Sequence, residues 1–274
     1  FEIGINSTNI HNRNFKWNTN FVLSYYRNYY VKRDANYVLG INETQRQDVN
    51  DMWQYVVDGM IPAGNPNAGA LKFKDLNGYL RDDSGNIVMV NGKPAYSGSP
   101  DGMIDEADMI YKGNSTPIPF SLNNSFEFGK FDVNVYFYGM FNNWQKNSTY
   151  TMFAGNLQNV ALYGENTLKS LANRWSYDNL NSSIPSIFAH VESTAAQRNG
   201  YYLEKAWFLR CDNVSLGYTF KTKKSNKYFS SLRVYAAARN LFVITPYSGS
   251  DPETDSQAAY PNSRTYTFGI DITF

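Results

Sequence analysis

Long runs of alternating apolar and polar residues constrain this chain more than any other feature of its sequence. Between residues 131 and 142, apolar residues occupy every second position, all of them aromatic or aliphatic except Gly139, and polar residues occupy most of the other positions. Because successive side chains of a strand point to opposite faces, this period predicts a strand of about twelve residues with one apolar and one polar face. Strands of globular proteins are usually only about five or six residues long.

The same alternation recurs along the chain and predicts seven strands in all. The predicted strands cover residues 1–9, 15–26, 120–128, 131–142, 202–220, 232–239 and 265–274. The connections between them alternate between short ones, at 10–14, 129–130 and 221–230, and long ones, at 28–116, 143–201 and 244–263. In the fifth strand the alternation loses its phase near Arg210–Asn213, which predicts a β-bulge.

Two all-β architectures use strands of this kind. A soluble β-sandwich buries the apolar faces of two sheets against each other, whereas a transmembrane antiparallel β-barrel turns its apolar face to lipid and its polar face to an aqueous lumen. Strict alternation of short turns and long loops is typical of outer-membrane barrels, and aromatic residues gather near the strand ends, as in an interfacial girdle. We therefore predict a barrel segment with long extracellular loops. Since single-chain barrels have even strand numbers, seven strands lead us to expect further strands before Phe1.

Composition excludes several other classes of protein. The net charge of +1 gives no basic stripe for nucleic acid. One cysteine and two histidines, His11 and His190, cannot supply a disulfide framework or a His/Cys metal centre. The sequence contains no catalytic motif, so we expect no enzyme; the alternative function from a different class is a secreted carbohydrate-binding β-sandwich.

The C-terminal part of the sequence resembles the end of SusC/RagA-type TonB-dependent outer-membrane transporters of Bacteroidetes. Those chains end with a strand reading R-V-Y-x-x-x-x-N-L, a loop reading T-x-Y-x-G-x-D-P-E, and a proline before an aromatic-ended last strand. The matching residues here are Arg233-Val234-Tyr235, Asn240-Leu241, Tyr247, Gly249, Asp251-Pro252-Glu253 and Tyr260-Pro261. The segments 1–28 and 126–143 resemble earlier hairpins of the same family.

This resemblance implies a location, partners and a function. It implies a barrel of about 22 strands in the bacterial outer membrane, filled by an N-terminal plug domain, of which residues 1–274 would be the C-terminal part. It also implies import of an oligosaccharide or a peptide together with a SusD-like surface lipoprotein, with energy supplied by TonB through a plug that precedes this sequence. Outer-membrane lipid is then a partner and nucleic acid is not.

An interrupted acidic stretch suggests a calcium loop. Asp75-Leu76-Asn77-Gly78 is separated by residues 79–100 from Asp101-Gly102-Met103-Ile104-Asp105-Glu106-Ala107-Asp108. Without the insertion, the order of oxygen ligands and glycine resembles an EF-hand-type loop, which makes Asp75, Asn77, Asp101, Asp105 and Asp108 candidate ligands. The alternative is a turn motif without metal, since Asp, Asn and Gly also cap turns. Turn signals at Gly85-Asn86 and Asn91-Gly92 predict a small hairpin within the insertion. No cofactor is otherwise required.

Candidate ligand-binding residues come from two places. Polar side chains of the strands would line the lumen, and aromatic side chains of the loops would stack on sugar rings. The candidates are Trp53, Trp144, Tyr163, Tyr235, Arg239 and Tyr247.

Overall fold

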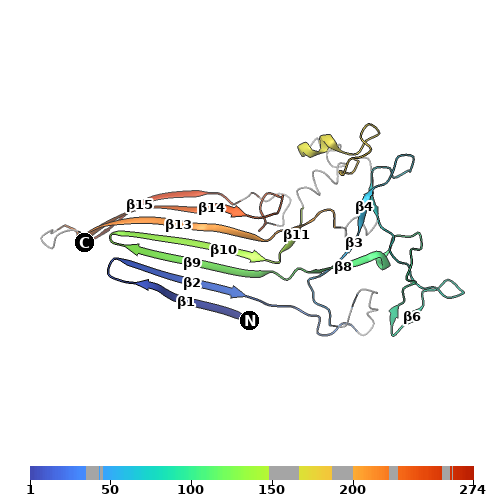
Figure 1. Cartoon of the computed structure of the whole chain (residues 1–274), viewed down its shortest axis with the longest axis horizontal. Coiled ribbons are helices and arrows are strands. Elements are labelled where there is room, and N and C mark those ends of the chain that lie inside the picture. The colour runs from blue at the N-terminus through green and yellow to red at the C-terminus, as the bar shows by residue number, and fades with distance from the viewer. Residues whose placement is uncertain are drawn as a thin grey trace.

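A single seven-stranded antiparallel sheet dominates the molecule (Figure 1). The computed structural model describes residues 1–34, 43, 46–147, 167–186, 200–221, 228–254, 260 and 262–274. The strands of this sheet lie in the order β1-β2-β9-β10-β13-β14-β15, so strands that follow one another in the sequence are also neighbours in the sheet. The strands are β1 (Glu2–His11), β2 (Phe15–Ser24), β9 (Ile118–Phe128), β10 (Phe131–Phe141), β13 (Phe208–Lys221), β14 (Ser231–Ile244) and β15 (Thr265–Thr273). All seven predicted strands are present.

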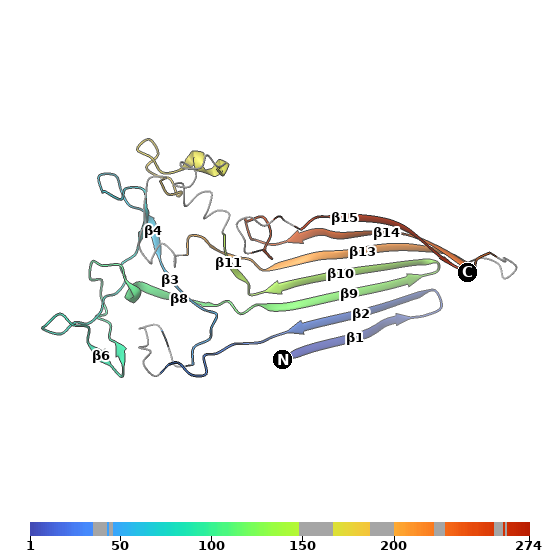
Figure 2. The same ribbon diagram turned by 180° about the vertical axis from the view of Figure 1, so that it is seen from behind.

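The short and long connections lie at opposite ends of this sheet (Figure 2). At the short-turn end, the Asn12 carboxamide oxygen accepts hydrogen bonds from the backbone N–H groups of Asn14 and Phe15, at 3.0 and 2.8 Å. Gly129, with a φ of 63°, makes the two-residue turn between β9 and β10. The C-terminus lies at the same end. This arrangement confirms the predicted alternation of short and long connections.

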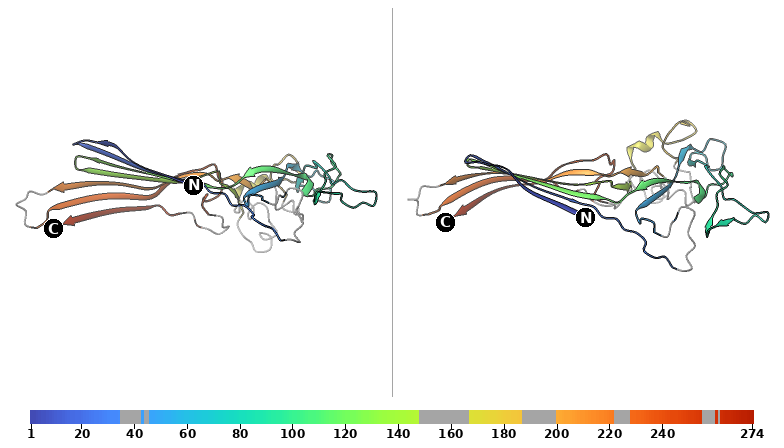
Figure 3. Two further views of the ribbon diagram at one scale, coloured as in Figure 1. Left: turned by 90° about the horizontal axis from the view of Figure 1, so that it is seen from below. Right: turned by 60° about the horizontal axis from the view of Figure 1, so that its bottom comes forward.

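The two faces of the sheet differ as the alternation predicts. Seen from its edge, the sheet is one twisted layer (Figure 3). Its apolar side chains are open: the exposed fractions of Phe268 and Ile270 are 83% and 65%. Within the described residues no second sheet pairs with or covers this face, since the four other sheets are two-stranded and formed by the loops. The β-sandwich alternative lacks its second layer here.

Where polar residues interrupt the apolar face, they bond to one another. Thr19 donates its hydroxyl proton to the Asn124 carboxamide oxygen at 2.7 Å, and the Trp17 indole N–H donates to the same oxygen at 3.0 Å. Asn9 donates to the Thr19 hydroxyl at 2.6 Å. Mutual hydrogen bonds reduce the cost of placing these groups in an apolar surrounding.

The predicted bulge is present, but the strand that carries it is shorter than predicted. The register of β13 shifts between Cys211 and Asn213 against both of its neighbours. Residues 203–205, predicted as part of this strand, form a separate strand, β12 (Leu203–Lys205), which pairs with β11 (Trp144–Lys146). The chain turns out of β10 at Asn142, which has a left-handed φ of 50° and donates to the Asn114 and Thr116 carbonyls. β10 therefore ends before it can pair with residues 203–205.

The long loops form their own small structures. Their strands are β3 (Asp51–Tyr55), β4 (Val57–Met60), β5 (Leu71–Phe73), β6 (Met89–Val90), β7 (Lys93–Pro94) and β8 (Met109–Asn114), and their 3-10 helices are η1 (Glu106–Asp108) and η3 (Lys169–Asn173). β3 pairs with β8, β4 with β5 and β6 with β7. The β6–β7 hairpin turns at Asn91 and Gly92, with φ of 53° and 75°, which confirms the predicted hairpin. Among the described residues, no helix has the length and apolarity needed to cross a membrane.

A compact core lies in these loops rather than in the long strands. Tyr55 and Met109 are buried together, with Trp53 and Phe73 packed against them. Among the described residues, Phe208 and Cys211 are the only buried hydrophobic side chains that belong to the seven long strands.

Candidate functional site

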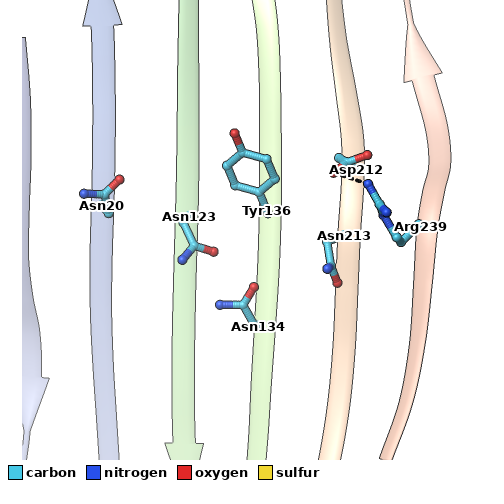
Figure 4. A pocket seen from close by; sticks show the side chains of 7 residues that line it. All are labelled: Asn20, Asn123, Asn134, Tyr136, Asp212, Asn213 and Arg239. Carbon is cyan, nitrogen blue, oxygen red and sulfur yellow. Dashed lines mark ion pairs between the residues drawn. The ribbon is translucent and has the colours of Figure 1, made fainter. Parts of the chain in front are cut away.

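The polar face carries a row of hydrogen-bonding side chains at one height across six strands. Strand pairing aligns neighbouring residues directly, and the row runs through Asn6, Asn20, Asn123, Tyr136, Asn213 and Arg239. Figure 4 shows that these side chains from β2 to β14 stand on the same face. Together with Asn134 and Asp212, members of the row line a hollow of about 500 Å³. We call this row the amide row.

Two acceptors in the amide row have no hydrogen-bond partner within the described part of the chain. They are the buried carboxamide oxygens of Asn123 and Asn213. A buried acceptor without a donor is costly, so these oxygens favour an occupant that donates hydrogen bonds, such as a hydroxyl or an amide N–H. The amide row is therefore suited to binding a polar group.

One charged pair stands at the edge of this hollow. A guanidinium nitrogen of Arg239 lies 3.9 Å from an Asp212 carboxylate oxygen, and the Arg239 side chain is 67% exposed. Both residues also line a second hollow of about 310 Å³. The predicted site residue Arg239 thus reaches two neighbouring hollows on the polar face.

Nearer the short-turn end, an ion-pair cluster crosses the same face. The Arg233 guanidinium lies 2.6 Å from Asp132 and 3.0 Å from Asp271. The Arg233 side chain crosses Gly217, where a Cβ atom would lie only 2.5 Å from the guanidinium group. The ring of Tyr235 in turn lies over Gly269, where a Cβ atom would approach it to 2.3 Å. The predicted site residue Tyr235 therefore lies on the polar face, below the amide row, with its ring 4.9 Å from the Arg233 guanidinium.

An unpredicted cluster, which we call the loop anchor, attaches the last long loop to β13. Arg210 is almost fully buried and pairs with Asp251 at 2.7 Å and with Glu253 at 2.5 Å. The Tyr138 hydroxyl donates to both Glu253 oxygens at 2.9 Å. Arg210 also donates to Asn240, which has a left-handed φ of 50°. The Asp-Pro-Glu and Asn-Leu elements quoted above thus meet on one arginine.

The predicted aromatic residues of the loops lie in separate places. Tyr247 is 7% exposed, and its ring lies over Gly249 within the anchored loop. Trp53, in β3, packs against Tyr111 with a centroid distance of 5.3 Å. Trp144, in β11, lies under the Lys205 ammonium at 5.7 Å. Tyr163 lies outside the described residues. The structure does not gather these aromatic side chains into one described hollow, and their roles stay predictions.

The acidic stretch folds into a set of hydrogen-bonded turns. Asp108, fully buried, accepts from the backbone N–H groups of Leu76 and Asn77 at 2.6 and 3.0 Å and from that of Asp105 at 2.9 Å. Asp75 accepts from the Gly102 N–H at 2.6 Å. The remaining candidates do the same: Asn77 accepts from Gly98, Asp101 from Met103, and Asp105 from Ala107.

The carboxylates of this stretch also influence one another. Burial, together with the neighbouring Asp108 and Asp101, raises the pKa of Asp105 above its usual value. Within the described residues, no three His, Cys, Asp or Glu side chains converge as a metal-ion cluster. The carboxylates of this stretch accept hydrogen bonds from the backbone N–H groups of their own turns.

Comparisons with known proteins agree with this architecture. No family model matches the chain. It is 26% identical over its full length to the TonB-dependent receptor SusC of Bacteroides thetaiotaomicron, covering 26% of that protein. It is 25% identical over its full length to the TonB-dependent receptor P3 of Formosa agariphila, covering 28% of that protein. The chain therefore spans about a quarter of the length of these curated relatives.

The fold comparison covers the whole chain as well. A structure of the RagAB peptide transporter superposes on it with a TM-score of 0.68 and 21% identity, and the match covers 100% of this chain and 29% of that one. A second structure, of the RagAB peptide importer in the 'closed-closed' state, gives a TM-score of 0.66 at 22% identity, again over 100% of this chain and 29% of that one. The chain is thus similar in sequence, along its whole length, to a portion of these TonB-dependent receptors, and it shares the fold of a portion of the RagAB structures.

Proposed function

We propose that this chain forms part of the barrel wall of a TonB-dependent importer of the bacterial outer membrane. The observation that carries the proposal is the single-layer sheet, with one open apolar face, one polar face, and all long loops at one end. A barrel wall needs this asymmetry because lipid meets one face and water the other. The full-length similarity to TonB-dependent receptors supports the same reading.

In this proposal the polar face lines the route of the imported molecule. The amide row supplies donors and acceptors without an apolar pocket, which suits an oligosaccharide or a peptide. Tyr235 and Arg239 contribute from the wall, while Trp53, Trp144, Tyr163 and Tyr247 contribute from the loops, either to the ligand or to the shape of the outer mouth. None of these side chains is proposed as a catalytic group.

The partners follow from the same proposal. A SusD-like lipoprotein would close over the loop end, and TonB would act on a plug domain of the complete protein. RagAB, the structural neighbour, is a peptide transporter with two named components, which supports a lipoprotein partner by analogy. Outer-membrane lipid would cover the apolar face.

For the acidic stretch we propose a turn assembly that holds its shape through backbone hydrogen bonds. Calcium is the alternative occupant of this stretch. Terbium luminescence of the complete protein, with calcium as competitor, tests it. A saturable signal that is lost in Asp101→Asn and Asp105→Asn variants would favour calcium over our reading.

The proposed function is tested in cells that lack the chromosomal copy of the complete protein. Complementation should place the protein in the outer-membrane fraction and restore uptake of fluorescently labelled oligosaccharides or peptides. A protonophore should abolish that uptake, since TonB draws on the energised inner membrane. If the purified protein is monodisperse without detergent and fractionates with secreted proteins, the proposal is wrong and a carbohydrate-binding β-sandwich takes its place.

A further inference from the structure

The apolar face has a furrow along β14. Phe131, Tyr218, Val234 and Ile270 form one row across β10, β13, β14 and β15, and Leu216, Ala236 and Phe268 align in the next row along. In each row the β14 residue is the smaller one, with larger side chains on the strands to either side. The resulting hollow measures about 510 Å³ and is lined by residues of all four strands.

The furrow is open and almost entirely apolar. Phe268 and Ile270, which form one wall, are 83% and 65% exposed, and Leu216, on the other wall, is 48% exposed. Its volume falls within the range of small-molecule sites, roughly 300–1,000 Å³. By register, Ala238 continues the line of small residues along the outer face of β14. The shape is therefore that of a groove running along a strand.

Positive charge meets the furrow at the short-turn end. Lys130, in the turn before β10, places its ammonium 5.9 Å from the ring of Tyr218, which stands in the first row of the furrow.

The acidic side chains nearest this end belong to the other face. Asp132 and Asp271 both pair with Arg233 on the polar side of the sheet. Glu127 pairs with Lys16 at 3.0 Å. The outward side of the short-turn end thus combines an apolar groove with the ammonium group of Lys130.

We propose that this furrow binds one acyl chain of an anionic phospholipid, with the phosphate-bearing headgroup beside Lys130. The proposal rests on the proposed function, because the furrow faces lipid only if the sheet spans a membrane. A groove that follows a spanning strand is aligned with lipid tails, and a cation at its end lies at the level of the headgroups. The lipid is then a resident of the leaflet next to the short turns.

The test uses the complete receptor, purified in detergent and examined by native mass spectrometry. Phosphatidylglycerol and phosphatidylcholine with the same acyl chains are the two probes. The wild type should retain phosphatidylglycerol about fivefold better, the factor expected when one basic residue adjoins an anionic headgroup. Lys130→Gln should remove this preference and leave binding of phosphatidylcholine unchanged.

A second variant tests the groove itself. Ala236→Leu fills the furrow and should reduce retention of both lipids several-fold. Ile5→Leu, an apolar substitution on the outward face of β1, is the matched control and should leave retention at the wild-type level. Outer-membrane fractionation and uptake show that each variant is assembled.

The outcomes separate this inference from the proposed function. If a receptor that assembles and imports retains the two lipids equally, or if Ala236→Leu binds them as the wild type does, the furrow is not a lipid site while the importer stands. If the wild type does not reach the outer membrane, the proposed function fails and the furrow proposal fails with it.

Discussion

The long strands and the loops of this molecule obtain their stability in opposite ways. The loops bury their own core, with Tyr55, Met109 and Trp175 each at 7% exposure or less. The seven-stranded sheet leaves Phe268, Ile270 and many other apolar side chains open. Burial of apolar surface is the main favourable contribution to folding. The loops therefore gain stability by burying apolar side chains among themselves, whereas the apolar face of the sheet needs an external apolar partner. In the function proposed above, the membrane supplies this partner and is part of the folded state of the sheet.

The strongest test of this comparison removes the loop anchor that joins the two regions. Arg210→Met leaves the buried Asp251 without its cation, at a cost of about 3–5 kcal/mol. Hydrogen exchange of the backbone amides in residues 245–254 should then accelerate by about a hundredfold or more. Arg239→Met is the control, because this exposed pair at 3.9 Å contributes only about 0–1 kcal/mol. Equal exchange in the two variants would show that the anchor does not hold the loop.

The next test asks whether lipid covers the apolar face. Val135→Arg, at the middle of β10, should destabilise the complete receptor in lipid vesicles by about 2–4 kcal/mol, the cost of arginine near the bilayer midplane. Asn134→Arg, the adjacent residue on the polar face, should cost far less. Urea unfolding followed by tryptophan fluorescence measures both. A larger loss for Asn134→Arg would reverse our assignment of the faces.

Acid should weaken the loops through Asp48. Burial acts to raise the pKa of Asp48, but hydrogen bonds from the Asn50 N–H and from Arg27 outweigh it and hold the pKa below its usual value. A carboxylate with a depressed pKa stabilises the folded state above its unfolded pKa of about 3.9. This stabilisation is lost as the pH falls below that value through the folded pKa.

An acid titration followed by near-ultraviolet circular dichroism measures this loss in the loops. The wild type should show a transition below about pH 4 that is shallower in Asp48→Asn. The difference should be about 1.5–3 kcal/mol, the contribution of a hydrogen bond to a charged group. Identical titrations would assign the acid sensitivity to other carboxylates.

The smallest expected effect concerns the ring of Tyr235, which lies over Gly269. Tyr235→Ala exposes the backbone of β15 and should cost about 0.2–1 kcal/mol, the range of a cross-strand pair. Tyr235→Phe keeps the ring and should retain most of the stability. The same urea experiment distinguishes them, and a Phe variant as weak as the Ala variant would assign the effect to the hydroxyl group instead.

Sequence reasoning predicted the regular part of this fold because its signals are local. Alternation marked every long strand, and Gly129 and Asn91-Gly92 marked two tight turns that the structure confirms. The lost phase near Cys211 located the bulge. Each of these signals is carried by neighbouring residues, whose facing and dihedral angles suffice to produce the pattern.

The parts that sequence reasoning missed depend on distant residues. Nothing near Arg210 announces that its partners lie 41 and 43 residues later, at Asp251 and Glu253. The departure of β12 from the main sheet depends on Asn142, some sixty residues earlier in the chain. The amide row was only partly predicted, through Arg239, because its members come from six strands and meet only through their register.

The bulge at Asp212 determines which face of the sheet the side chains of β13 point to. Without an extra residue, side chains three positions apart would point to opposite sides, and Arg210 would face away from Asn213. With it, Asn213 lies opposite Tyr136 and Arg210 opposite Tyr138, so both turn inward. If Asp212 were instead paired as a regular strand residue, the residues before it would change faces, so that Arg210 would turn to the apolar face and Cys211 to the polar face. The one unpaired residue thus keeps Arg210 and Asn213 on the same face of the sheet although they are three positions apart in the sequence.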